Sequence, residues 1–137
     1  MASILEAAPR MKRMARPEFQ CEVRVQFLPD KSPLPDGPFA FAYTVNIRNT
    51  GDITAQLVAR HWVVVDADGQ REDVRGLAVV GHQPLLRPGE QFEYSSWTRI
   101  PTPHGTMRGT YFCMTEDAHP FEAPVGSFTL VAPSALH

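Results

Sequence analysis

Apolar and polar residues alternate along two early segments of the chain. In residues 19–27 (FQCEVRVQF) and 39–47 (FAFAYTVNI), every second residue is apolar and most of the residues between are polar or small. This period of two places the apolar side chains on one face of an extended strand. Residues 29–38 (PDKSPLPDGP) contain prolines, aspartates and a glycine, which favour an exposed loop. We therefore predict two half-buried strands that share one core.

The next segment, residues 57–66 (LVARHWVVVD), is apolar on both faces. A tryptophan on a central strand is typical of immunoglobulin-like sandwiches, so we expect Trp62 to point inward. Strict alternation then puts Leu57, His61 and Val63 on the other face, partly exposed. We interpret this stripe as a surface for a partner. Asp66 to Gly69 predicts a tight turn after the strand.

The second half of the chain predicts further short strands separated by turn residues. We expect short pieces at residues 72–75 and 77–81, divided by Gly76, and then strands near residues 92–100, 107–114 and 121–131. A bulge or bend is expected near Pro124 and Gly126. Trp97 falls on a polar strand face and joins the predicted partner surface. The expected core contains or borders five aromatic residues, namely Tyr43, Trp62, Phe92, Tyr94 and Tyr111.

About seven strands with no βαβ pattern predict an all-β fold, an antiparallel β-sandwich of the fibronectin type III or immunoglobulin-like kind. The length of 137 residues suits one domain. We expect residues 1–16 to form a flexible N-terminal tail and residues 17–137 to form the domain. No segment approaches the ~20 apolar residues of a spanning helix, and no signal peptide is evident, so we expect a cytoplasmic protein without membrane insertion.

The charge and the candidate chemical groups exclude several classes of function. The net charge of −2 disfavours binding to nucleic acid. Cys21 and Cys113 form no C-x-x-C pair, and the histidines lack the spacing of metal ligands. Ser95 and Ser96 have no G-x-S-x-G context. We therefore expect no catalytic residues, no metal site and no cofactor.

The order of the motifs resembles the ApaG family over residues 19–137. The motifs that carry the resemblance are Arg60-His61-Trp62, Asp66-x-x-Gly69, Val80-Gly81-x-Gln83-Pro84, Leu86-x-Pro88-Gly89-Glu90-x-Phe92-x-Tyr94-x-Ser96, Thr102-Pro103-x-Gly105-x-Met107-x-Gly109-x-Tyr111 and a closing Pro133 and His137. The resemblance implies a fibronectin type III-like sandwich. Bacterial members are linked by name to cobalt and magnesium efflux or resistance. Similar domains occur in eukaryotic F-box proteins and in a polymerase delta-interacting protein, which implies a protein-binding module.

The family usually carries a G-x-G-x-x-G run where this chain has Gly76, Ala78 and Gly81 at the three glycine positions. A phosphate cradle normally places such glycines between a strand and a helix, whereas the flanks here are strand-like. Our leading hypothesis is a non-enzymatic protein-interaction domain that uses Leu57, His61, Val63 and Trp97. Its partner is an unidentified protein, with a second copy of the chain among the candidates. The alternative is a small-ligand protein that binds a divalent cation, or a pyrophosphate compound or nucleotide near Gly76, Ala78 and Gly81.

Overall fold

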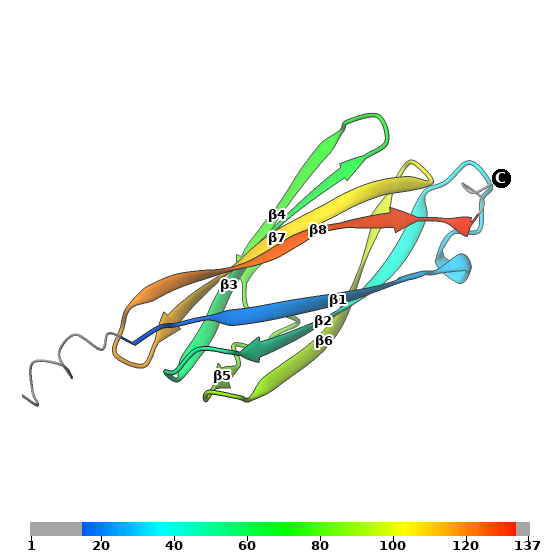
Figure 1. Cartoon of the computed structure of the whole chain (residues 1–137). Helices are drawn as coiled ribbons and strands as arrows, with labels where there is room; N and C mark the ends of the chain where they lie inside the picture. Colours follow the sequence, from blue (N-terminus) through cyan, green and yellow to red (C-terminus); the bar gives the residue numbers. More distant parts are fainter. Residues whose placement is uncertain (1–14, 134–137) are drawn as a thin grey trace, which may run out of the picture.

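Two antiparallel sheets face each other in this protein (Figure 1). The computed structural model describes residues 15–133. The smaller sheet has the strand order β1-β2-β6, and the larger sheet has the order β4-β3-β7-β8, with β5 also paired to β3. The strands are β1 (Phe19–Phe27), β2 (Phe39–Asn49), β3 (Ala55–Asp66), β4 (Arg71–Leu77), β5 (Leu85–Leu86), β6 (Gln91–Ile100), β7 (His104–Thr115) and β8 (Pro120–Val131). The prediction of an all-β antiparallel sandwich is confirmed.

The strand bounds agree closely with the alternating segments, with two exceptions. The bounds predicted for β1 are correct, and β8 carries the expected irregularity, because its register with β7 shifts between the pairs Met107–Phe128 and Gly109–Val125. The division at Gly76 was wrong, since β4 continues through that residue to Leu77. The piece expected at residues 77–81 is mostly loop. The short strand β5 was not predicted.

Aromatic side chains from both sheets fill the space between them. Trp62 of β3 packs with ring-centroid distances of 5.4 Å to Tyr43, 5.9 Å to Tyr111 and 6.0 Å to Phe128. Tyr43, Trp62, Tyr94 and Tyr111 are buried, and Phe92 is partly buried against the same cluster. The predicted core aromatics are therefore confirmed.

A bulge in β3 reverses which residues point inward. Leu57 pairs with Cys113 of β7, but Ala59 pairs with the adjacent residue Phe112, so Val58 is an extra residue on β3. A bulge of this kind changes the parity of the strand. Leu57 consequently faces the core before the bulge, and Trp62 faces the same core after it.

The domain boundary predicted near residue 16 lies at the edge of the described residues. Residues 1–14 fall outside them, and so does most of the proposed tail. The backbone N–H of Arg16 donates to Asp52 Oδ1 at 2.6 Å, and its carbonyl accepts from the N–H of Asp52. Arg16 is thus attached to the domain, and the boundary stays a prediction.

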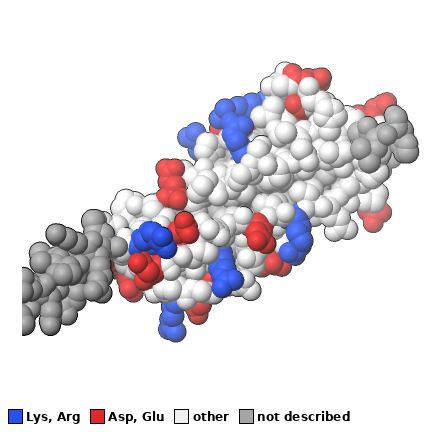
Figure 2. Space-filling model, viewed as in Figure 1, with Lys and Arg blue, Asp and Glu red and all other residues white. Residues whose placement is uncertain are grey.

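The visible surface carries interspersed charges of both signs rather than one extended basic area (Figure 2). Among residues 15–133, no helix is long and apolar enough to cross a membrane.

Candidate functional site

The run from Gly76 to Gly81 leaves the end of β4 and folds over the side chain of Arg60. Arg60 Nη1 donates to the carbonyl oxygens of Leu77 and Ala78, at 2.7 and 2.8 Å. A Cβ atom added to Gly76 would lie 2.9 Å from the same Nη1 atom, closer than real Cβ contacts allow. Glycine at position 76 therefore leaves room for the guanidinium group, which holds the loop carbonyls.

The second half of this run is a tight turn. Val79 and His82 exchange both backbone hydrogen bonds, at 2.8 and 2.9 Å. Between them Val80 and Gly81 have φ angles of 48° and 80°, as in a type I′ turn. Ala78, just before the turn, also has a positive φ of 67°. Backbone conformation thus accounts for glycine at the second and third positions of the pattern, since glycine alone adopts positive φ freely.

Several backbone N–H groups of the loop are already hydrogen-bonded within the protein. The N–H of Ala78 donates to the carbonyl of Val58 at 2.8 Å, and the N–H groups of Val79 and His82 bond to each other's carbonyls. A phosphate cradle needs such N–H groups free to point at the ligand. The geometry therefore adds no support to a nucleotide or pyrophosphate site at Gly76, Ala78 and Gly81, which stays a prediction.

We expect Ala78→Gly to raise the free energy of unfolding by about 0.5–1 kcal/mol. An L-residue at positive φ costs roughly 1–2 kcal/mol, and part of the relief is offset by the greater freedom of glycine in the unfolded chain. Urea denaturation would measure the change. The matched control is Ala59→Gly in β3, where φ is not positive and a loss of about 0.5–1 kcal/mol is expected. Equal losses from both variants would contradict the proposed strain at Ala78.

The stripe predicted as a partner surface is only partly exposed. Leu57 is 0% exposed, because the bulge at Val58 turns it into the core, so its predicted exposure was wrong. Val63 does lie on the outer face, but it is only 6% exposed. Its neighbours in the sheet are Asp73 of β4 and Arg108 of β7, whose aliphatic parts can cover it. His61 is partly exposed, as expected.

A different set of apolar side chains occupies this outer face. Ala59 of β3 lies between Leu77 of β4 and Phe112 of β7 in the register, and Leu77 is 73% exposed. In the adjacent part of the sheet, Gln56 lies between the exposed residues Leu85 and Met114. We call Ala59, Leu77, Leu85, Phe112 and Met114 the outer apolar patch. The alternation of β7 indicated the side on which Phe112 and Met114 lie, but Leu77 and Leu85 were missed because β4 and β5 were misassigned.

Charged side chains border the outer apolar patch along β4. Asp73 accepts a hydrogen bond from Arg71 Nε at 2.7 Å and lies 2.7 Å from His61 Nε2. Hydrogen bonds from Arg71 and then His61 lower the pKa of the Asp73 carboxyl well below its usual range. Asp73 is therefore ionised at neutral pH. Arg75 and Leu77 line a shallow hollow of ≈ 460 Å³ beside this cluster.

Trp97 lies on the outer face of the other sheet, away from this patch. It is 46% exposed, which agrees with its predicted position on a polar strand face. Lys31 Nζ lies 5.0 Å from its ring centroid, and the guanidinium carbon of Arg99 lies 5.6 Å from it. Two cations thus pack against the indole. The single partner surface expected from the sequence is therefore divided between opposite faces of the sandwich.

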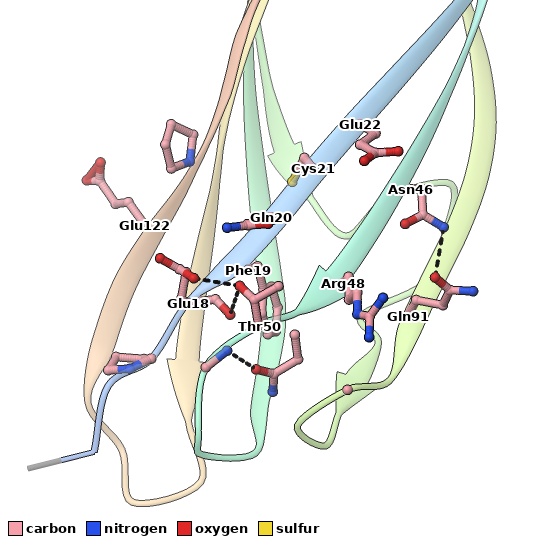
Figure 3. A pocket seen from close by; sticks show the side chains of 15 residues that line it. Glu18, Phe19, Gln20, Cys21, Glu22, Asn46, Arg48, Thr50, Gln91 and Glu122 are labelled. Atoms are coloured by element: carbon pink, nitrogen blue, oxygen red, sulfur yellow. Dashed lines mark hydrogen bonds between the residues drawn. The ribbon is translucent and has the colours of Figure 1, made fainter.

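A polar hollow of ≈ 1050 Å³ lies near the start of β1 (Figure 3). Glu18, Glu22 and Glu122 contribute carboxylates to its lining, and Arg48 contributes a guanidinium group. The hydroxyl of Thr50 donates to Glu18 Oε1 at 2.7 Å. The lining is a mixture of charges and amides on an open surface, and it presents no set of groups arranged for one reaction.

The histidines and cysteines are the side chains of this chain best suited to metal ligation or nucleophilic chemistry. Within residues 15–133, no three His, Cys, Asp or Glu side chains lie close enough together to hold a metal ion. Burial raises the pKa values of the Cys21 and Cys113 thiols to about 12. Both thiols are consequently protonated at neutral pH, and a protonated thiol is a poor nucleophile. The expected absence of catalysis and of bound metal stays a prediction.

Comparisons with known proteins identify the family of this chain. The ApaG domain model matches residues 29–115. Protein ApaG of Ralstonia nicotianae is 56% identical over 90% of this chain and 100% of its own length, and Protein ApaG of Methylobacillus flagellatus is 45% identical over 93% of this chain and 100% of its own length. The crystal structure of the ApaA protein of Bordetella pertussis superposes with a TM-score of 0.82 at 47% identity, covering 85% of this chain and 95% of that chain. On this evidence of sequence and fold together, the chain belongs to the ApaG family.

Proposed function

We propose that this ApaG-family protein is a non-enzymatic domain that binds another protein through the outer apolar patch. The observation that carries the proposal is the exposure of Leu77, Leu85, Phe112 and Met114 on one sheet face. Exposed apolar side chains gathered on one face, with charged residues at their border, are typical of protein-binding surfaces. Arg75, His61 and Asp73 supply such a border here.

The chemistry of the patch favours an apolar or aromatic anchor from the partner. Phe112 and Met114 are large, polarisable side chains, and residues of this type are enriched at interfaces. Leu77 and Phe112 line the same shallow hollow, which offers a place for one inserted side chain. Arg75 at the rim adds a positive charge, so an acidic group beside the apolar anchor of the partner would complement it.

The cobalt and magnesium efflux to which bacterial members are linked by name fits this proposal through the bound partner. A binding domain contributes to efflux by attaching to a protein that itself moves or senses the cation. The raised pKa values of the two thiols support the non-enzymatic part of the proposal, because they leave the chain's cysteines unreactive at neutral pH.

Site-specific photocrosslinking tests the patch directly. With benzoylphenylalanine in place of Phe112, we expect ultraviolet light to yield a discrete adduct with a cellular protein. The matched control carries the same probe in place of Trp97, which is exposed on the opposite sheet, and we expect no such adduct. Adding Leu85→Glu and Met114→Lys to the Phe112 probe should reduce the adduct at least about tenfold, because charges would then be buried at the interface.

The variants must first be shown to fold, by circular dichroism and urea denaturation. Equal adducts from both probe positions would mean that the patch has no special role. Failure of the Phe112 probe to capture any protein in native cells would also contradict the proposal.

A further inference from the structure

Strand β4 forms one edge of the larger sheet and has neither a proline nor a bulge, although four of its seven residues are charged. Its register with β3 runs from Ala59–Leu77 to Val65–Arg71 without a shift. Its sequence, REDVRGL, contains no proline. Proteins usually protect such edges with prolines, bulges or charges. At the opposite end of the sheet, β8 contains Pro120 and Pro124 and lies alongside β1 (Figure 1).

The backbone of β4 has polar groups directed away from β3. The N–H of Asp66 donates to the carbonyl of Gln70, and the N–H of Ala78 donates to Val58. These two bonds show which residues of β4 bond to β3, because in an antiparallel pair every second residue bonds to the neighbouring strand. On β4 these are the even-numbered residues. The N–H and C=O groups of Arg71, Asp73 and Arg75 therefore point outward, to where a further strand would lie.

When two copies of β4 lie side by side and antiparallel, residues of opposite charge face each other across the pair. Antiparallel pairing of β4 with itself about Val74 puts Asp73 opposite Arg75 of the second copy, and Arg75 opposite Asp73 of the second copy. Arg71 then lies opposite Leu77 of the second copy. The aliphatic stem of Arg71 can cover the exposed Leu77 side chain. We infer that a second copy of this chain pairs with β4 across a two-fold axis at Val74, which joins the two larger sheets into one.

The other registers allowed by the ladder are less favourable, because only pairing about Val74 uses all seven residues of β4. Pairing about Asp73 places Arg71 opposite Arg75, and pairing about Arg75 places that residue opposite itself. Pairing about Glu72 brings two glutamates together. Like charges directly opposite each other destabilise a sheet. The register about Val74 also satisfies Arg75, which makes no ion pair within residues 15–133.

This inference goes beyond the proposed function, because it uses the main chain and the charged side chains of β4. The pair would cover Leu77 and engage Arg75, and it would leave Phe112, Leu85 and Met114 of the outer apolar patch exposed. The photocrosslink at Phe112 tests the patch two strands away from the edge, while the experiments below test only β4.

Disulfide trapping in the full chain tests the axis. In the inferred pair the two Val74 Cα atoms lie ~4.5 Å apart, as in a non-hydrogen-bonded antiparallel pair, which is within the range that a disulfide spans. We expect Val74→Cys to form a covalent dimer under mild oxidation. The control Glu72→Cys should not, because its two copies would be ~13 Å apart along the strand. Ser96→Cys, placed similarly on the other exposed edge strand β6, should also remain monomeric.

Exchanging the charges of Asp73 and Arg75 gives an independent test, in which analytical ultracentrifugation measures self-association. We expect Asp73→Arg alone and Arg75→Asp alone each to weaken self-association at least about tenfold, since each puts like charges opposite each other. An equimolar mixture of the two variants should associate again, because every pair is then of opposite sign. Equal trapping of Val74→Cys and Glu72→Cys would overturn the inference, as would a wild type that stays monomeric or a mixture that does not recover.

Discussion

Replacing Trp62 with alanine is expected to lower the free energy of unfolding by about 3–5 kcal/mol, the usual cost of truncating a buried tryptophan. Trp62 is in the centre of the core, where Tyr43 and Tyr111 pack against its ring. A Cβ atom added to Gly109 of β7 would lie 2.5 Å from Trp62 Cε3, so the indole lies directly on the glycine backbone. No neighbouring side chain can fill the space left by the indole unless a strand moves. Urea denaturation followed by circular dichroism would measure the loss.

The natural control for this variant is Trp97→Ala on the exposed face of the smaller sheet. The cations of Lys31 and Arg99 lie over the Trp97 ring on this face. We expect it to cost at most about 1 kcal/mol, in line with an exposed cation–π contact. A loss below about 1 kcal/mol for Trp62→Ala would show that its indole is not packed between the sheets.

The second large effect is expected at the tyrosine pair that joins the two sheets. The hydroxyl groups of Tyr94 on β6 and Tyr111 on β7 are hydrogen-bonded in the core. Burial raises the pKa of both tyrosines above the usual range, so both stay protonated and one donates to the other. We expect Tyr111→Phe to cost about 1–3 kcal/mol, because the buried Tyr94 hydroxyl then loses its partner.

A double-mutant cycle separates this hydrogen bond from simple packing. Tyr94→Phe alone should cost a similar amount, whereas the double variant should cost clearly less than the sum, since both polar groups are then removed from the core. Additive losses would mean that the two hydroxyl groups do not depend on each other. Melting curves of the four proteins at one pH provide the comparison.

Local sequence patterns were sufficient to predict much of the fold. The bounds of β1 and the inward direction of Tyr43 and Tyr111 followed from alternation alone, because successive side chains of a strand point to opposite faces. Asp66 was expected to form a turn, and its Oδ1 accepts from the N–H groups of Asp68 and Gln70, each at 2.9 Å. These features depend on residues close together in the chain.

The surface hypotheses depended on more distant contacts and were only partly correct. Leu57 was placed outside because nothing in its neighbourhood indicates the bulge at Val58. The register of β3 with β7 shifts at this bulge, and the carbonyl of Val58 accepts hydrogen bonds from the Ala78 N–H and the Gln83 side chain of the following loop. The bulge that reverses the inward face of β3 is thus bonded to a loop about twenty residues downstream, which local alternation does not reveal.

Local alternation and the order of motifs were enough to predict the all-β class, most strand positions, the aromatic core and the membership in the ApaG family. Which apolar residues stay exposed could be seen only in the folded protein. Val63 and Leu77 both lie on the outer face, yet one is covered by its strand neighbours and the other lies on an open edge. Exposure depends on what packs against a side chain, and in a β-sandwich those neighbours come from strands distant in sequence.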